Sequence, residues 1–172
     1  MGRRKPFRRP RPRVISSLVF ALTLAGGAAL VLKPKGRTLE GRAHVVDGDT
    51  IRLGDAKIRL KGIDAPEMEQ ICSRSGHAYE CGETSRKALI AMVSGETVRC
   101  RAAGRDRYRR ILARCTVNGS DVGARMVEQG WALSYGRDYD LEETRARERA
   151  VGLWAGEFER PQDWRRRGSA GS

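Results

Sequence analysis

Residues 42–67 read RAHVVDGDTIRLGDAKIRLKGIDAPE, and their pattern is the clearest indication of the fold. Apolar and polar residues alternate through 42–47, 49–53 and 57–61, which is the period of half-buried β-strands. Gly54 and Asp55 separate the second run from the third and are typical of a tight turn. The stretch therefore predicts three consecutive antiparallel strands.

Further along the chain, helical and strand-like patterns alternate. Asp121 can cap a helix that stops at Gly130, and Asp140 with Glu143 forms a capping-box pattern. We expect a helix at 83–93, strands at 96–101 and 110–116, and helices at 121–129 and 140–151. This order predicts an α+β protein with a five-stranded Greek-key barrel of the OB type and about three helices.

The basic residues are unevenly distributed along the 172-residue chain. Lys and Arg number 34 against 21 Asp and Glu, but ten of the basic residues and none of the acidic ones lie within 1–37. Residues 38–172 therefore carry only +3 of the net charge of +13. A small net charge makes no strong long-range field, so any case for nucleic-acid binding has to rest on individual arginines.

Nineteen residues without a charge, 14–32, follow seven Lys and Arg within 1–13. Their length suits a membrane-spanning helix, and the small residues near their end suit cleavage by a signal peptidase. We expect a signal anchor or signal peptide at 14–32, a cytoplasmic flank at 1–13 and a linker at 33–40. The working domain, 41–158, is then extracytoplasmic, either membrane-anchored or secreted or periplasmic, and 159–172 form an Arg-rich, frayed tail.

The four cysteines are even in number, and an exported chain matures in an oxidising compartment. Cys100 and Cys115 fall in two strands that can pair as a hairpin, where cross-strand neighbours meet disulfide distances. Cys72 and Cys81 would then close a short loop. A zinc site is the rival interpretation, but the spacing contains no C-x-x-C pair. Two disulfides are therefore predicted.

Acidic residues cluster in two loops, DGDT at 47–50 and DAPE at 64–67. Each loop alone is more often a simple turn. Arg59 lies on the strand between them, so carboxylates and a guanidinium could converge at one end of a small barrel. Phosphodiester cleavage uses those groups. It needs oxygen ligands that bind a hard cation, a guanidinium that donates two hydrogen bonds to phosphate oxygens, and a base that activates the attacking water.

Four stretches resemble, in order, the motifs of the thermonuclease family typified by staphylococcal nuclease. They are VVDGDTI at 45–51, IRLKGIDAPE at 58–67, DRYRR at 106–110 and GLW at 152–154. The resemblance covers about 41–156. It implies an OB-fold barrel with three helices and a Ca²⁺-dependent nuclease that cleaves DNA and RNA and leaves 3′-phosphates. It implies nucleic acid as the substrate and does not imply a protein partner. The membrane is a partner if 14–32 stay uncleaved.

The resemblance also implies a metal site. Asp49 and Asp64 match the Ca²⁺ carboxylates, and Ala65 matches a position that supplies a backbone carbonyl. Many members have Thr there, but a carbonyl ligand survives the change to Ala. Asp47 is similar to an acidic residue that adds negative potential near the metal.

The resemblance assigns the remaining site roles by position. Glu67 matches the general base, and Arg59 and Arg110 match the arginines that hold the phosphate and stabilise the transition state. Arg107, Tyr108 and Tyr135 resemble nucleotide-contacting positions.

One residue departs from the family pattern. Arg109 stands where the family normally has Gly, and a positive φ at this position would cost an Arg about 1 kcal/mol or more.

Two other kinds of function compete with the nuclease. A non-catalytic OB-fold module tethered to the membrane would bind nucleic acid without cleaving it. A protein that used only its basic N-terminus on anionic lipid would need none of the four motifs. The complete set of Asp49, Asp64, Glu67, Arg59 and Arg110 favours the enzyme.

Overall fold

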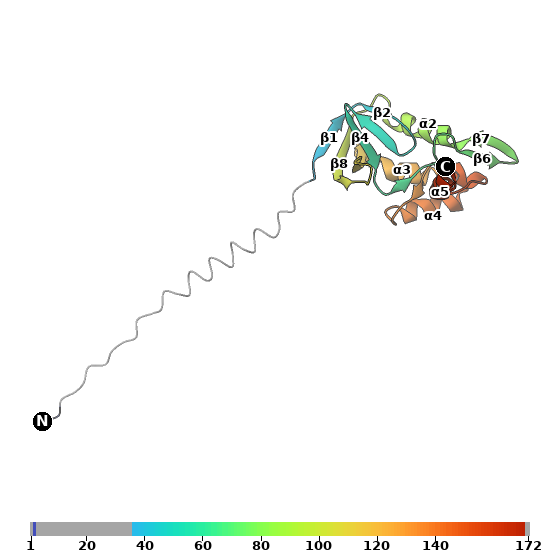
Figure 1. Cartoon of the computed structure of the whole chain (residues 1–172). Helices are drawn as coiled ribbons and strands as arrows, with labels where there is room; N and C mark the ends of the chain where they lie inside the picture. Colours follow the sequence, from blue (N-terminus) through green and yellow to red (C-terminus); the bar gives the residue numbers. More distant parts are fainter. Residues whose placement is uncertain (1, 3–35, 171–172) are drawn as a thin grey trace. The chain divides into compact units, whose positions relative to one another are not determined.

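The computed structural model describes residue 2 and residues 36–170 (Figure 1). None of the helices in this part of the chain combines the length and the apolar composition that a membrane span requires. The predicted anchor or signal at 14–32, with its flank at 1–13, lies outside the described residues.

The described residues form strands and helices in mixed order, which confirms the α+β class. The strands are β1 (Thr38–Gly41), β2 (Ala43–Val45), β3 (Thr50–Leu53), β4 (Ala56–Leu60), β5 (Ile63–Asp64), β6 (Ile71–Arg74), β7 (His77–Glu80), β8 (Val98–Arg105), β9 (Ile111–Val117), β10 (Ser120–Asp121) and β11 (Leu133–Ser134). The helices are α2 (Cys81–Val93), α3 (Val122–Glu128), α4 (Asp140–Glu148), a 3₁₀ turn η1 (Gly152–Ala155) and α5 (Pro161–Ala170).

The main sheet has the order β1-β8-β9-β4-β3-β2, and β10 pairs with β9. The three strands predicted from 42–67 are β2, β3 and β4, and they pair antiparallel as expected. Strand β4 then joins β9 in parallel, with Ile58 opposite Ile111. The predicted number of five strands was too low, because β1 and the short β10 also join this sheet, which has seven strands within the described residues. The sheet curls into a half-barrel with β1 and β2 at its edges (Figure 1).

Alternation along the strands explains which face becomes the core. Ile51 and Ile58 lie opposite each other on β3 and β4 and are almost fully buried, whereas their neighbour Arg52 is exposed. Helix α2 adds Leu89 and Met92 to the same buried cluster. Removing such apolar surface from water is the main stabilising contribution, about 25 cal/mol per Å².

Both predicted disulfides are present. Cys100 and Cys115 are direct cross-strand partners on β8 and β9, with their Cα atoms 4.0 Å apart. Cys72 on β6 joins Cys81 at the start of α2. The residues between this pair form the hairpin β6–β7, which had no strand pattern clear enough to predict.

The helix starts were predicted with mixed success. Asp121 caps α3, because its carboxylate accepts a hydrogen bond from the Ala124 N–H. The capping box at α4 is wrong, since Tyr139 occupies the N-cap and makes no side-chain cap. Glu143 instead accepts a hydrogen bond from the Ser134 N–H of β11. Helix α4 also ends at Glu148, before the expected residue 151.

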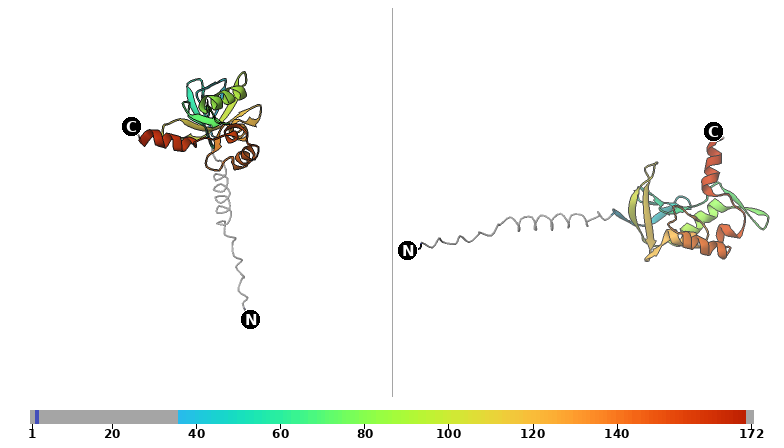
Figure 2. Two further views of the ribbon diagram at one scale, coloured as in Figure 1. Left: turned by 90° about the vertical axis from the view of Figure 1, so that its right-hand side faces the viewer. Right: turned by 90° about the horizontal axis from the view of Figure 1, so that it is seen from below.

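Two expectations about the ends of the domain need correction. The linker predicted for 33–40 overlaps β1. Thr38–Gly41 pair with β8 as an edge strand, so these residues belong to the sheet. The tail predicted to fray contains α5 (Pro161–Ala170), drawn in red in Figure 2. Pro at the first helical position suits a helix start, because its missing N–H needs no partner there.

Candidate active site

The loop that leads into β3 places Asp49 on the sheet. The Asp47 carboxylate accepts a hydrogen bond from the Asp49 N–H at 3.0 Å, and the Thr50 hydroxyl donates to Asp49 Oδ1 at 2.9 Å. Gly48 allows this loop to approach α2, because a Cβ there would lie 2.2 Å from Ser85 Oγ. The sequence DGDT is therefore needed for its backbone as well as for its carboxylates.

Arg59 joins the two predicted metal-binding carboxylates. Arg59 lies on β4 opposite Thr50, and Asp64 lies on β5. Its Nη2 atom lies 2.7 Å from Asp49 Oδ2 and 2.9 Å from Asp64 Oδ1. The first two motifs of the chain therefore meet at one guanidinium, as the sequence predicted.

Burial makes it energetically costly for the carboxyls of this group to carry charge. Asp49 and Asp64 are only 4% and 5% exposed. Burial raises the pKa of Asp49 from its ordinary value to about 7, although the Arg59 cation acts in the opposite direction. A second cation close to Asp49 would favour its ionised form.

Glu67 is linked to Asp64 by Arg165, a residue that the sequence did not indicate. Arg165 on α5 donates from Nη1 to Glu67 Oε1 at 2.6 Å and from Nη2 to Asp64 Oδ1 and Oδ2 at 2.9 and 3.0 Å. Arg165 belongs to a run of three arginines, 165–167, and nothing in that run distinguishes it from its neighbours. The local sequence carried no signal that could have identified it.

A buried glutamine connects the Glu67 loop to the segment that leads into α5. Gln70 is fully buried, its Oε1 accepts from the Glu67 N–H at 3.3 Å, and its Nε2 donates to the Glu159 carbonyl at 2.7 Å. Both ends of one side-chain amide are therefore satisfied, as burial of a polar group requires.

Arg110 lies apart from the carboxylate group. It pairs with Asp106, with Arg110 Nε 2.6 Å from Asp106 Oδ2, inside the turn between β8 and β9. Asp106 also accepts hydrogen bonds from the Tyr108 and Arg110 N–H groups. Among the described residues, no hydrogen bond or ion pair joins Arg110 to Asp49, Asp64 or Glu67.

The predicted nucleotide contacts are exposed. Tyr108 is 65% exposed, and the guanidinium carbons of Arg107 and Arg110 lie 4.8 and 5.5 Å from its ring centroid. Tyr108 and Arg110 line a cavity of about 640 Å³ that also contains basic side chains from β4 and β8. Tyr135 follows β11, is 58% exposed and donates its N–H to the Gly62 carbonyl.

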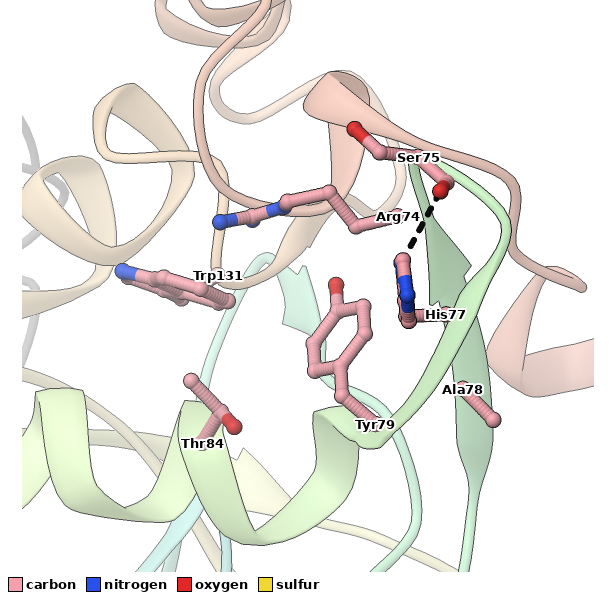
Figure 3. A pocket seen from close by; sticks show the side chains of 7 residues that line it. All are labelled: Arg74, Ser75, His77, Ala78, Tyr79, Thr84 and Trp131. Carbon is pink, nitrogen blue, oxygen red and sulfur yellow. Dashed lines mark hydrogen bonds between the residues drawn. The ribbon is translucent and has the colours of Figure 1, made fainter.

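A second cavity, of about 410 Å³, contains none of the predicted site residues (Figure 3). Tyr79 and Trp131 line it, and the Arg74 guanidinium carbon lies 5.3 Å from the Tyr79 ring centroid. Arg74 also donates to the Gly152 carbonyl at 2.6 Å. The hairpin β6–β7 forms one side of this cavity. Because the sequence did not predict the hairpin, it did not predict the cavity either.

The donor atoms suit a hard cation. Asp49, Asp64 and the Ala65 carbonyl offer only oxygen, the ligand that Ca²⁺ prefers. Within 36–170, no three His, Cys, Asp or Glu side chains group as a metal site. Two carboxylates and one carbonyl would leave water to complete the coordination of a calcium ion.

Comparisons with known proteins agree with the motifs. The family model described as staphylococcal nuclease homologue matches residues 57–156. The chain is 34% identical over 152 residues to the succinoglycan biosynthesis protein ExoI of Rhizobium meliloti, covering 83% of this chain and 75% of that protein. It is also 34% identical to an uncharacterized endonuclease of Haemophilus influenzae, covering 71% of this chain and 70% of the relative. An uncharacterized endonuclease of Escherichia coli shares 34% identity over 68% of this chain and 78% of its own length. The matched region spans β4 to the 3₁₀ turn η1, and the chain belongs to the family of staphylococcal nuclease homologues.

Proposed function

We propose that this protein is a Ca²⁺-dependent nuclease that hydrolyses phosphodiester bonds of DNA and RNA and leaves 3′-phosphates. The observation that carries the proposal is the meeting of Asp49 and Asp64 at the Arg59 guanidinium, with Glu67 linked to Asp64 through Arg165. Relatives named endonuclease support the same reaction class.

Glu67 is the proposed general base. Its side chain is one-third exposed, so a water molecule can reach the carboxylate. Glu67 takes a proton from that water as the water oxygen bonds to phosphorus. The bond from phosphorus to the 5′ oxygen breaks, and the 5′ oxygen leaves and gains a proton from solvent. The phosphate then stays on the 3′ oxygen.

Arg59 is the proposed electrostatic partner of the phosphate. The Arg59 side chain is 19% exposed and its guanidinium is held in place by two carboxylates, so it is oriented before substrate arrives. Bound Ca²⁺, held by Asp49, Asp64 and the Ala65 carbonyl, would supply Lewis-acid stabilisation of the developing phosphate charge. Asp47 would add negative potential that attracts the cation.

We propose that Arg107, Tyr108 and Tyr135 contact the nucleotides on either side of the cleaved bond. Tyr108 and Tyr135 are exposed aromatic side chains on which bases can stack, and Arg107 adds a cation for phosphate. Arg110 is the proposed second phosphate arginine, and it would have to exchange its Asp106 partner for substrate.

The proposed location is outside the cytoplasm. Both disulfides are almost fully buried, which suits a chain that folds in an oxidising compartment. The sequence of 14–32 is the proposed signal or membrane anchor.

The test uses the full-length chain in mild detergent with end-labelled single-stranded DNA or RNA, in Ca²⁺ or in chelator. We expect Ca²⁺-dependent cleavage with 3′-phosphate ends, and a loss of about 10²–10⁴-fold in Glu67→Gln, the usual contribution of a general base. Glu69→Gln, an exposed acid two residues away, is the matched control and should cleave like the original protein. Binding without cleavage, equal in all three proteins, would support the non-catalytic module instead.

A further inference from the structure

Arg165 brings together carboxylates from separate positions in the fold. Asp64 lies on β5 and Glu67 on the loop after it, whereas Arg165 lies 101 and 98 residues further along the chain. One guanidinium uses Nη2 for both Asp64 oxygens and Nη1 for Glu67 Oε1. A planar fork can hold two carboxylates in a fixed relation, which a flexible ammonium cannot.

Glu67 depends on this contact for its orientation. Within residues 36–170, the hydrogen bonds and ion pairs of its carboxylate are all made with Arg165. Its side chain is 33% exposed, so packing alone does not restrict its rotamers. Without Arg165 the carboxylate would be free to turn into solvent.

The segment before α5 is anchored well enough to present Arg165. Ser73 on β6 and Glu157 exchange two backbone hydrogen bonds, at 2.9 and 2.8 Å. Gln70 holds the Glu159 carbonyl with the same side chain that accepts the Glu67 N–H. The start of α5 and the Glu67 loop are therefore fixed to each other through the buried Gln70 amide.

We propose that Arg165 is a positioning residue of the active site, which holds Glu67 beside Asp64 in the orientation that the reaction needs. This inference rests on the proposed function, because it takes Glu67 as the base and Asp64 as a metal ligand. It makes α5 part of the catalytic apparatus, although α5 lies beyond the matched residues 57–156.

The proposal predicts two effects of Arg165→Ala in opposite directions. The rate of the chemical step falls, because Glu67 loses its orientation. Ca²⁺ binds more tightly, because Arg165 is a cation that shares both Asp64 oxygens with the incoming ion. A purely structural arginine would weaken both properties, and a merely blocking arginine would make both stronger.

The experiment compares Arg165→Ala, Arg165→Lys and Arg166→Ala in the full-length chain in mild detergent. Arg166 is the matched control, since it is the neighbouring arginine, is 71% exposed and pairs with Asp163 on its own helix. Each protein is assayed by calorimetric titration with Ca²⁺, by single-turnover cleavage of an oligonucleotide at saturating Ca²⁺, and by thermal unfolding.

For Arg165→Ala we expect the cleavage rate to fall about 10- to 100-fold, the usual cost of losing a partner that orients an active-site group. We expect its Kd for Ca²⁺ to fall about fivefold, as removal of one unit charge near the ion predicts. Arg165→Lys keeps the charge but loses the fork, so its rate should fall while its Kd changes less. Arg166→Ala should match the original protein in all three measurements.

Several results would overturn the proposal. A faster Arg165→Ala would identify a blocking cation, and weaker Ca²⁺ binding together with a lowered melting temperature would identify a structural role. Equal rates for Arg165→Ala and Arg166→Ala would also reject it. If the original protein does not cleave at all, the proposed function fails instead, and the calorimetry still tests whether Arg165 competes with the cation.

Discussion

Arg109 adopts a φ of 65°, the left-handed conformation that suits glycine. The turn around it is tightly specified, because Asp106 accepts the N–H groups of Tyr108 and Arg110 while the Arg109 N–H donates to the Asp106 carbonyl. The family glycine at this position is thus explained by backbone geometry. The chain keeps the turn and bears the conformational cost of an L side chain.

Arg109→Gly should stabilise the protein by about 1 kcal/mol, because it relieves the left-handed strain at this residue. Arg105 should still donate to the residue 109 carbonyl, since that contact uses the backbone. Urea unfolding of the original protein, Arg109→Gly and Arg109→Ala measures the effect. Arg109→Ala keeps the strain and should not gain the same stability, and a gain equal to that of Gly would contradict this explanation.

Asp138 shows how a single charge makes stability depend on pH. The Lys61 ammonium, whose Nζ lies 2.6 Å from Asp138 Oδ2, holds the pKa of that carboxyl below its ordinary value, with Arg114 adding to the effect. A carboxyl whose folded pKa is lowered stabilises the fold above its unfolded pKa. That stability is lost as the pH falls through the folded pKa.

Asp138→Asn should therefore lose part of its stability at neutral pH and show a flatter decline below about pH 4, the unfolded pKa of Asp. Chemical unfolding at a series of pH values checks this expectation. Acid limbs of equal slope in the two proteins would show that the Lys61 contact contributes nothing to the folded state.

At the scale of elements, the two disulfides hold different parts of the domain. Cys100–Cys115 links β8 to β9 inside the main sheet. Cys72–Cys81 links β6 to the start of α2, and β6 carries Ser73, the residue that bridges to the segment before α5. The first disulfide secures the core, and the second secures the neighbourhood of Glu67 and Arg165.

Replacing either cysteine pair by alanine should lower the free energy of unfolding by about 2–4 kcal/mol, the typical contribution of a native disulfide. Only the Cys72→Ala, Cys81→Ala protein should also cleave more slowly per folded molecule, because β6 helps to anchor the segment that presents Arg165. Cleavage rates below the onset of unfolding decide the matter. Equal cleavage rates in the two double variants would show that the anchoring by β6 does not affect catalysis.

At the level of the whole molecule, the candidate site combines one early stretch, residues 49–67, with Arg165 near the end of the described chain. The carboxylates come from the loop before β3 and from β5, and their partners come from β4 and α5. Apart from Pro161 at the start of α5, the buried apolar residues, in contrast, all lie at or before Leu153. Helix α5 therefore contributes to the site more than to the core.

A chain that ends at residue 160 should fold yet cleave about 10- to 100-fold more slowly, since it lacks the arginine that orients Glu67. A chain that ends at residue 168 keeps Arg165 and is the control. Circular dichroism reports folding, and single-turnover cleavage reports function. Full activity in the shorter chain would make α5 dispensable for catalysis.

The strand pattern of 42–67, the cap at Asp121 and both cysteine pairs were predictable because each depends on neighbours in the chain or on one strand pair. The convergence of Asp49, Arg59 and Asp64 was predictable because Arg59 lies on the strand between the two acidic loops. The β6–β7 hairpin was not, because its sequence is polar and short. The predicted capping box is absent because the Glu143 carboxylate accepts a hydrogen bond from the Ser134 N–H on β11 instead.

The α+β class, the central strands, the disulfides and the family could all be predicted from the sequence, since local periodicity and ordered motifs carry that information. The folded structure was needed to show that Arg165, rather than Arg166 or Arg167, contacts Asp64 and Glu67, and that Arg110 pairs with Asp106. The ion-pair partner of an arginine depends on which carboxylates the folded chain places within reach of its guanidinium. That choice depends on how α5 is anchored through Gln70 and Glu159, a contact across 89 residues that no local pattern encodes.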